Sequence, residues 1–132
     1  MSKLKIDVII PAFNEENSVG KVIDELPKEF VNEIIVIDNN SSDATFETIK
    51  KHGATALKQP IQGYGIACLK GLEYISNKTE KPDIVAFLDA DYSDFPEEIL
   101  LICQPIIEGK ADMVIGSRAL GKSERGSMTI PQ

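Results

Sequence analysis

The sequence has few of the residues that build sulfur-rich metal sites, redox centres and histidine-based sites. Among its 132 residues are two cysteines, one histidine and no tryptophan. Cys68 and Cys103 are 35 positions apart, which matches no metal-binding or redox spacing. We therefore expect two buried free thiols, as in proteins of a reducing cytoplasm. The single histidine, His52, precedes Gly53 at a predicted helix end, so we expect it to be a surface or capping residue.

Positive charge is also scarce. The chain has fourteen Lys and Arg residues and twenty-one Asp and Glu residues, which gives a formal net charge of −7. A nucleic-acid partner is disfavoured, because a phosphate backbone requires a basic binding surface. An anionic small ligand is compatible with this composition only if a cation or helix N-termini assist its binding.

Long apolar runs are missing as well. No segment reaches the ~18 apolar residues that span a membrane. The first apolar run, Val8 to Ile10, is interrupted at once by Pro11, Asn14 and Glu15. The sequence therefore predicts no transmembrane segment and no secretory signal peptide.

Short apolar runs alternate with segments of helical periodicity, and the hydrophobic fraction of 42% is sufficient for one domain over residues 1–132. Uninterrupted apolar strands separated by helices are typical of a parallel sheet covered on both faces, so the predicted fold class is α/β. The predicted strands are Ile6–Ile10, Ile34–Ile37, Ala54–Leu57, Ile84–Leu88 and Met113–Ile115. The predicted helices are 19–26, 43–52, 65–77 and one that begins after Asp94. No clear periodicity follows in residues 116–132.

Polar residues follow four of these strands. They are Pro11–Glu16, Asp38–Asp43, Asp89–Asp91 and Gly116–Arg118. Ligands of open α/β sheets bind beyond the carboxyl ends of the strands. The sequence therefore predicts a binding site built from these four segments.

Two carboxylates one residue apart, Asp89 and Asp91 on either side of Ala90, are the strongest candidates for a metal site. Mg²⁺ and Mn²⁺ take one or two carboxylates and complete their coordination with phosphate oxygens and water. A cation there would offset the charge of a diphosphate leaving group. The alternative is that Asp91 or Asp94 only caps the next helix, but Asp94 alone suffices for that cap.

Two other segments have two possible roles each. Asp38 ends a buried strand and needs hydrogen-bond donors, which are either a nucleobase imide or backbone N–H groups of the Asn39–Asp43 turn. In the first segment, Asn14 and Glu16 fit the start of a helix. That explanation leaves out Pro11, Ala12 and Phe13, which can form a wall against a base or ribose.

Gly63 and Gly65 flank Tyr64 at the start of the third predicted helix. Close packing or a helix start explains them best, and the helix N-terminus can also face a ligand phosphate. They do not form a dinucleotide fingerprint, which follows the first strand of a fold. Arg118 follows the fifth strand and suits phosphate recognition, or it is simply a surface arginine. Lys122 and Arg125 extend the basic side of the site or are solvated.

The motifs VIIPAFNEE, VIDNNSSDAT, FLDADYSDFPEE and VIGSR, in this order and spacing, resemble family 2 glycosyltransferases of the GT-A fold. The likeness covers Ile6 to about Arg125 and is strongest to transferases that act on dolichol or polyprenyl phosphate. It implies a donor pocket lined by Pro11, Ala12, Asn14 and Glu15, with Asp38 against the base. It also implies a metal on Asp89 and Asp91 beside the donor sugar, and Arg118 facing phosphate.

The sequence departs from this family at two motif positions. The second motif often reads Asp-Asp-Gly-Ser, whereas Asn39 stands here in place of the second acidic residue. Some polyprenyl-phosphate members carry glutamine two residues after the D-x-D, where this chain has Ser93. The resemblance therefore implies no acidic role at position 39 and a weaker or water-completed metal site.

The function implied is inverting transfer of a sugar from a UDP- or GDP-linked donor, with Mg²⁺ or Mn²⁺, to an acceptor such as a lipid phosphate. Family catalytic domains extend further, so we expect the N-terminal part of a longer domain in the cytoplasm, with the full-length protein at the cytoplasmic face of the membrane as one option. Alternatives are a nucleotide-binding fragment without transferase activity and a sugar nucleotidyltransferase, although the latter has a Gly-rich, Arg-containing first loop. The sequence leaves the base, the sugar, the acceptor and the oligomeric state open.

Overall fold

The computed structural model describes residues 5–91, 113–115 and 128–130. In chain order its elements are β1 (Ile6–Ala12), α1 (Val19–Glu25), β2 (Val31–Asp38), α2 (Thr45–Lys51), β3 (Thr55–Lys58), α3 (Tyr64–Ser76), β4 (Ile84–Phe87), β5 (Met113–Ile115) and β6 (Met128–Ile130). The described strands form one sheet in the order β3-β2-β1-β4-β5-β6. Strands β1 to β5 all run parallel to one another, whereas β6 runs antiparallel to β5.

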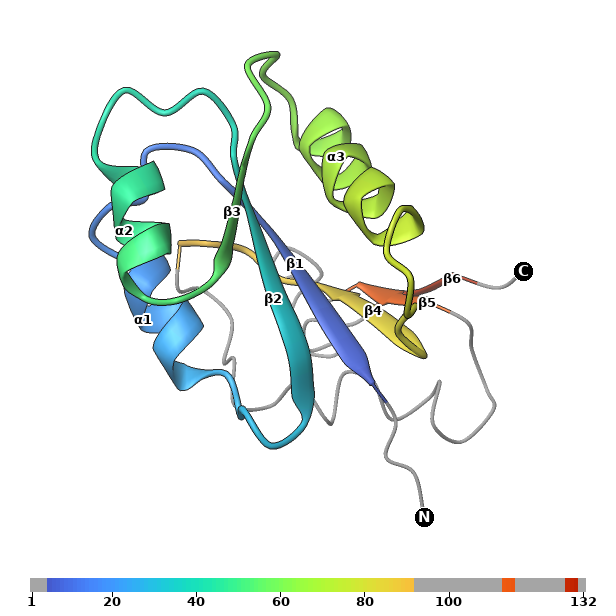
Figure 1. The fold of residues 1–132 in the computed structure, drawn as a ribbon. Helices are drawn as coiled ribbons and strands as arrows, with labels where there is room; N and C mark the ends of the chain where they lie inside the picture. The colour runs from blue at the N-terminus through green and yellow to red at the C-terminus, as the bar shows by residue number, and fades with distance from the viewer. Residues whose placement is uncertain (1–4, 92–112, 116–127, 131–132) are drawn as a thin grey trace.

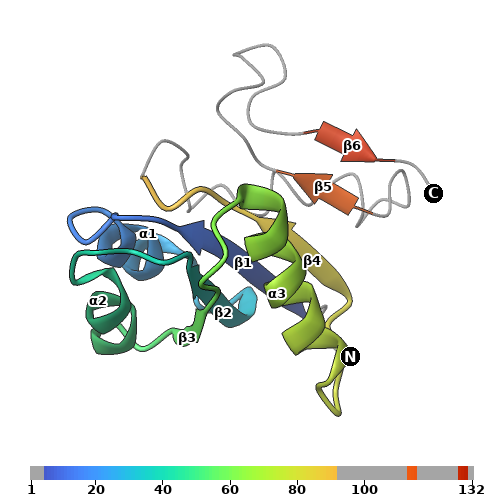
Figure 2. The same cartoon turned by 90° about the horizontal axis from the view of Figure 1, so that it is seen from above.

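The central strands β1, β2 and β4 are largely buried on both faces, as expected for apolar parallel strands. Helices α1 and α2 cover one face and α3 covers the other (Figures 1 and 2). Alternate residues of β1 point into two separate cores: Ile10 packs with Val22 and Ile49, whereas Ile9 packs with Ala67 and Phe87. Each such fully buried side chain stabilises the fold by about 1.5–3 kcal/mol.

Helix α3 lies unusually close to the sheet because Gly71 faces it. A Cβ atom at Gly71 would be 2.8 Å from Cγ2 of Ile9 and 3.1 Å from Cδ1 of Ile37. The absence of a side chain therefore sets the distance between α3 and the sheet, and with it the position of the first residue of α3.

The connection between β3 and β4 creates the place where a ligand can bind. The chain adds β2 and β3 on one side of β1, then crosses through α3 and places β4 on the other side (Figure 1). The chain after β1 therefore leads to β2 on one side of β1, whereas the chain after β4 leads to β5 on the other side. In open parallel sheets a crevice forms at this reversal of strand order.

The predicted order of strands and helices is confirmed throughout the described residues. The strand β2 begins at Val31, three residues before the predicted Ile34, and β6 was not predicted because its three residues show no periodicity. Gly53, with φ of 86°, follows α2 as expected, and His52 is the C-cap residue of that helix. The helix predicted after Asp94 lies outside the described residues.

Two local predictions are wrong. Helix α1 begins at Val19 after Ser18, so Asn14 does not cap it, and the first turn of α1 contains no acidic residue. Cys68 is only partly buried, because it lies at the margin of the α3 core beside the exposed Tyr64. Cys103 lies outside the described residues. No helix in the described part of the chain combines the length and apolar character that crossing a membrane requires.

Candidate functional site

A cavity of about 400 Å³ lies at the carboxyl ends of β1, β2 and β4. The register of the sheet explains why these ends meet, since Ala12 is opposite Asp38 and Ile9 is opposite Phe87. The lining residues are Pro11, Ala12, Phe13, Glu15, Asn39, Tyr64, Asp89, Ala90 and Asp91. The structure therefore brings the D-x-D segment together with most of the predicted first-strand segment.

The cavity is acidic. Its charged lining residues are Glu15, Asp89 and Asp91, and no lysine, arginine or histidine is among the described residues that line it. A phosphorylated ligand would be repelled by these carboxylates unless a cation lay between them. The cavity thus suits an anionic ligand only together with positive charge.

The carboxylates fit a hard divalent cation. Asp89 and Asp91 line the same cavity, and the described residues contain no cluster of three or more His, Cys, Asp or Glu side chains placed to hold a metal. Mg²⁺ and Mn²⁺ sites of phosphoryl-ligand proteins commonly use one or two carboxylates and leave other positions to phosphate and water. The donor set here is of that kind and differs from a closed protein cage.

The loop after β1 is fastened to the loop after β2. The Asn14 N–H donates to Oγ of Ser41 at 2.8 Å, and the Ser42 N–H donates to Oδ1 of Asn14 at 2.8 Å. The Glu15 N–H donates to Oγ1 of Thr45, also at 2.8 Å. Asn14 has φ of 52°, a left-handed conformation that asparagine tolerates. Asn14 is therefore a loop-joining residue and does not line the cavity.

Glu16 extends this junction to the next helix. Its Oε1 atom accepts a hydrogen bond from the Ala44 N–H at 2.9 Å, just before α2 begins at Thr45. The predicted effect of Glu16 on a helix N-terminus is thus seen at α2, and α1 is not involved. Asp43 also contributes, because its Oδ1 accepts from the Thr45 N–H at 3.0 Å.

Ser18 connects the first loop to the D-x-D segment. Its Oγ atom lies 2.7 Å from the carbonyl oxygen of Ala90 and 2.8 Å from Oε1 of Glu15. The hydroxyl has a single proton, so it donates to one of these acceptors at a time. The backbone between Asp89 and Asp91 is in this way linked to the start of α1 and to a carboxylate of the cavity.

Asp38 lies next to this cavity and faces a smaller hollow of about 140 Å³, which it lines with Asn40, Ser41 and Lys58 among others. Its Oδ1 accepts a hydrogen bond from the Ser41 N–H at 3.0 Å. A backbone N–H group of the turn after β2 is thus one partner of Asp38, as the sequence allowed. A base contact by Asp38 stays a prediction. The neighbouring Asn39, which sequence reasoning did not select, lines the larger cavity.

Helix α3 contributes Tyr64 to the cavity wall. Gly63 precedes the helix as its N-cap, with φ of 145°, and Gly65 has no atom within 4 Å of an added Cβ. Neither glycine lines the cavity, so the helix-start role fits Gly63 and a phosphate contact stays a prediction. One turn after Tyr64, burial raises the pKa of the Cys68 thiol, and the negative charge of Asp89 raises it further. Arg118, Lys122 and Arg125 lie outside the described residues.

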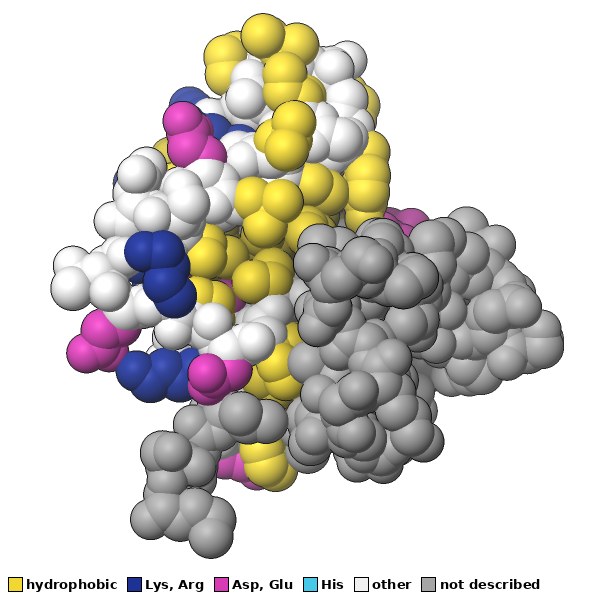
Figure 3. Space-filling view, turned by 90° about the vertical axis from the view of Figure 1, so that its right-hand side faces the viewer, with side chains coloured by type: hydrophobic (Ala, Val, Ile, Leu, Met, Phe, Trp, Pro, Cys, Tyr) yellow, Lys and Arg dark blue, Asp and Glu magenta, His cyan; other side chains and the backbone are white. Residues whose placement is uncertain are grey.

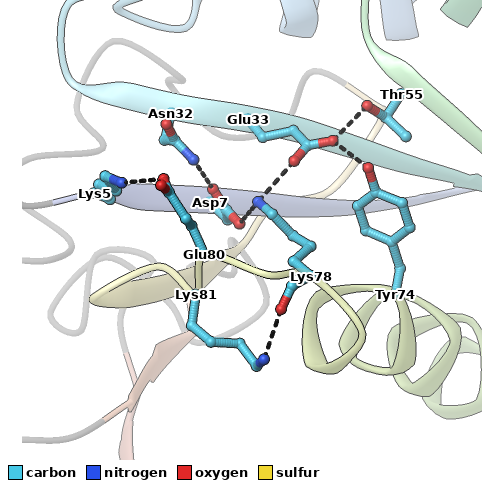
Figure 4. Close-up of polar contacts among 9 residues, drawn as sticks. All are labelled: Lys5, Asp7, Asn32, Glu33, Thr55, Tyr74, Lys78, Glu80 and Lys81. Carbon is cyan, nitrogen blue, oxygen red and sulfur yellow. Dashed lines mark hydrogen bonds and ion pairs between the residues drawn. The ribbon is translucent and has the colours of Figure 1, made fainter.

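A second polar cluster lies near the amino-terminal ends of β1 and β2, at the end of these strands opposite the cavity (Figure 4). Asp7 and Glu33 are neighbours on β1 and β2, and Nζ of Lys78 lies 2.7 Å from a carboxylate oxygen of each. Glu33 also accepts hydrogen bonds from Tyr74 at 2.6 Å and Thr55 at 2.7 Å. No buried side-chain nitrogen or oxygen among the described residues lacks a partner. These groups satisfy one another, so the cluster is explained by stability.

Hydrophobic side chains gather on one face of the molecule, at the height of α3 and of residues 59–63 before it (Figure 3). The exposed large hydrophobic residues include Ile61, Tyr64 and Leu69. Phe13, 47% exposed, and Tyr64, 52% exposed, belong both to the exposed apolar surface and to the cavity. Aromatic rings in such positions can contact the flat face of a base or sugar.

Comparison with known proteins shows the family to which the chain belongs. The model of the family described as "Glycosyl transferase family 2" matches residues 7–132. An uncharacterized protein of Methanocaldococcus jannaschii is 34% identical, over 98% of this chain and 53% of its own length. A UDP-N-acetylglucosamine--dolichyl-phosphate N-acetylglucosaminyltransferase of Methanococcus voltae is 28% identical, over 98% of this chain and 58% of its own.

Among solved structures, glucosyl-3-phosphoglycerate synthase from Mycobacterium tuberculosis, in complex with Mn²⁺, UDP-glucose and phosphoglyceric acid, is similar to this chain. The TM-score is 0.68 at 28% identity, covering 81% of this chain and 41% of that protein. The GT-A fold expected from the motifs is thereby confirmed. The chain spans about half the length of the curated relatives that it matches.

Proposed function

The chain belongs to glycosyl transferase family 2, and from this premise we propose that its acidic cavity binds a nucleoside-diphosphate sugar for transfer to an acceptor. The observation that carries the proposal is the meeting of Asp89 and Asp91 with Phe13 and Tyr64 in one cavity. The carboxylates bind a cation that in turn binds the diphosphate, and the aromatic rings contact the nucleoside or the sugar. We favour a UDP-linked donor, since one relative is named for a UDP-linked sugar and one structural neighbour is in complex with UDP-glucose.

In this proposal Asp89 and Asp91 hold Mg²⁺ or Mn²⁺. When bound, the cation supplies positive charge that stabilises the departing diphosphate. Pro11, Ala12 and Glu15 form the wall of the donor pocket on the β1 side. Asn39 and Tyr64 form its wall on the β2 and α3 side. Asp38 contacts the base, and Gly63 and Gly65 open the helix whose N-terminus lies near phosphate. We assign phosphate recognition to Arg118, from the motif alone.

The transfer step is proposed to invert the anomeric carbon. An acceptor oxygen forms a bond to that carbon on the side opposite the diphosphate, while the bond from the carbon to the diphosphate oxygen breaks and the diphosphate keeps the electron pair. A lipid phosphate is the acceptor we favour, because an ionised phosphate oxygen needs no protein base to activate it. One relative carries dolichyl phosphate in its name.

Residues 1–132 act in this proposal as one donor-binding domain in the cytoplasm, where a free thiol such as Cys68 is compatible with reducing conditions. The alternative is that the chain binds the donor without transferring the sugar. It is favoured by one observation, since the chain spans about half the length of its matched relatives. Binding and transfer are therefore tested separately.

The experiment is calorimetric titration of UDP, GDP, UDP-glucose and GDP-mannose in Mn²⁺ and then in EDTA. We expect one nucleotide to bind only with Mn²⁺, and Asp91→Asn to weaken that binding at least tenfold, because a carboxylate ligand is lost. Asp24→Asn on α1 is the matched control, since its side chain is 59% exposed and does not line the cavity. Equal affinities of the Asp91→Asn variant and the parent chain would reject this metal site.

A further inference from the structure

The side chain of Asn39 connects the end of β2 with residues 59–63, which we call the β3–α3 loop. Its Nδ2 atom donates to the carbonyl oxygens of Gln59, at 2.9 Å, and Ile61, at 2.8 Å. Its Oδ1 atom accepts the Gly63 N–H at 2.9 Å. Three contacts from one carboxamide thus reach three positions of a loop that is 20 to 24 residues away in sequence.

The chemistry of these partners dictates the orientation of the amide. Two of them are carbonyl oxygens, which only accept, and the third is an N–H group, which only donates. Rotating the amide by half a turn would place oxygen against two oxygens and nitrogen against an N–H. The Asn39 side chain is 6% exposed, so water does not replace these contacts at low cost. Both protons of the amide are therefore committed to the loop.

The β3–α3 loop depends on such contacts because it buries little apolar surface. Residues 60–63 are all exposed, and Ile61 is 63% exposed. Apart from those of Asn39, three hydrogen bonds of the described residues involve the loop. The Gln59 N–H donates to the Asp38 carbonyl at 3.0 Å, the Ile61 N–H donates to Oε1 of Gln59 at 3.0 Å, and the Ala67 N–H donates to the Gly63 carbonyl at 3.1 Å. The first anchors only the beginning of the loop, the second is internal to it, and the third joins Gly63 to α3 without fixing it to the sheet.

The end of the loop determines where α3 starts. Gly63 is the N-cap residue, and Tyr64, the first helical residue, lines the cavity with Asp89 and Asp91. Asn39 holds Gly63 directly, and its own N–H donates to the Ala12 carbonyl at 2.8 Å. One residue thereby links β1, the end of β2 and the aromatic wall on α3.

We infer that Asn39 is a positioning residue for the donor: its carboxamide holds the β3–α3 loop so that Tyr64 closes the cavity opposite the D-x-D segment. The inference rests on the proposed function for the identity of the ligand, but the loop contact is independent of it. Aspartate, which related motifs often carry at this position, is nearly the same size but cannot donate. It would direct negative charge at two carbonyl oxygens, so this loop conformation requires asparagine.

The test compares Asn39→Asp with Asn77→Asp, a matched control that makes the same amide-to-carboxylate change at the C-cap of α3. Asn77 is exposed, has φ of −93° and lines neither the cavity nor the smaller hollow beside Asp38. Amide hydrogen exchange is measured first, without ligand. We expect the Gly63 amide to exchange at least tenfold faster in Asn39→Asp only, while amides of α1 keep the parent rate.

UDP binding with Mn²⁺ is measured next, and we expect Asn39→Asp alone to weaken it at least tenfold. Unchanged affinity, or an unchanged Gly63 exchange rate, would overturn the inference. If the parent chain binds no nucleotide, the proposed function and the donor part of this inference fail together, and Gly63 exchange still decides the loop contact. Should Asn39→Asp not fold, Asn39→Ala removes the same contacts without adding charge and is judged by the same two measurements.

Discussion

Small polar side chains hold the loops of the candidate site together. Asn14 joins the loops after β1 and β2 through Ser41 and Ser42, and Ser18 joins the start of α1 to Ala90. Each contact is a single hydrogen bond, worth about 1 kcal/mol. At the scale of the residue, uncharged side chains therefore make several of the contacts that hold the cavity loops in place.

Replacing Ser18 by alanine should weaken Mn²⁺-dependent nucleotide binding by about fivefold, which corresponds to about 1 kcal/mol. The reason is that the Ala90 carbonyl loses its hydroxyl partner, and the D-x-D backbone becomes less well positioned. Ser76→Ala is the control, because Ser76 also donates from Oγ to a backbone carbonyl, that of Glu73, at the far end of α3. Calorimetry that gives equal losses for the two variants would argue against a positioning role of Ser18.

At the scale of the element, the packing of α3 depends on its glycine residues. Gly71 allows the helix to approach the sheet, whereas Gly65 is near its start with nothing close to it. Two glycines of one helix thus have opposite packing environments. This difference separates the effect of helix propensity from the effect of close packing.

Gly71→Ala should lower the free energy of unfolding by about 1–3 kcal/mol, because the added methyl group overlaps Ile9. Gly65→Ala should not lower it, since alanine favours helix by up to about 1 kcal/mol and meets no neighbouring atom within 4 Å. Urea unfolding followed by circular dichroism measures both. A Gly71→Ala variant as stable as Gly65→Ala would mean that α3 can move away from the sheet without loss.

At the scale of the whole molecule, charged side chains stabilise the end of the sheet opposite the cavity. Burial alone would raise the pKa of Glu33, but hydrogen bonds from Lys78, Tyr74 and Thr55 outweigh it and keep that pKa below its usual value. Burial would lower the pKa of Lys78, but Asp7 and Glu33 raise it. The stabilisation from Glu33 is present above pH of about 4.3 and is lost as pH falls through its lowered pKa. The stabilisation from Lys78 is present below pH of about 10.4 and is lost as pH rises through its raised pKa.

Lys78→Met should lower the free energy of unfolding by about 3 kcal/mol at pH 7, because Asp7, which is 0% exposed, and Glu33 lose the ammonium between them. The deficit should shrink as pH falls toward 4, since protonation of Glu33 then relieves its repulsion with Asp7. Urea unfolding at several pH values measures both effects. Lys5→Met, at the exposed pair with Glu80, is the control and should change stability little. A deficit independent of pH would contradict this account.

Much of the fold was predictable because periodicity and strand-end chemistry are local signals. The apolar runs at Ile6–Ile10 and Ile84–Leu88 locate two strands, and the polar residues after them locate the cavity edge. Asn39 and Ser18 were not predictable, since their partners at Gly63 and Ala90 are distant in sequence. No local pattern indicates which loops a fold brings together.

The partial burial of Cys68 and the strand β6 escaped prediction for related reasons. A thiol on an apolar helix face is expected inside, but the edge of a core cannot be distinguished from its centre without the neighbouring elements. Met128–Ile130 pairs with Met113–Ile115, and three residues are too few for an alternating pattern. The metal and phosphate roles of Asp89, Asp91 and Arg118 were inferred from motifs and remain predictions.

The central strand also has a consequence for synthesis on the ribosome. One edge of β1 pairs with β2, which ends at Asp38, and the other pairs with β4, which ends at Phe87. Forty-nine residues (87 minus 38) are translated between those two points, which takes roughly 2–10 s at about 5–20 residues per second. During that interval the nascent chain presents an unpaired apolar strand edge, the kind of template on which chains aggregate. The strand order that creates the binding crevice thus also creates an interval in which a chaperone would be useful.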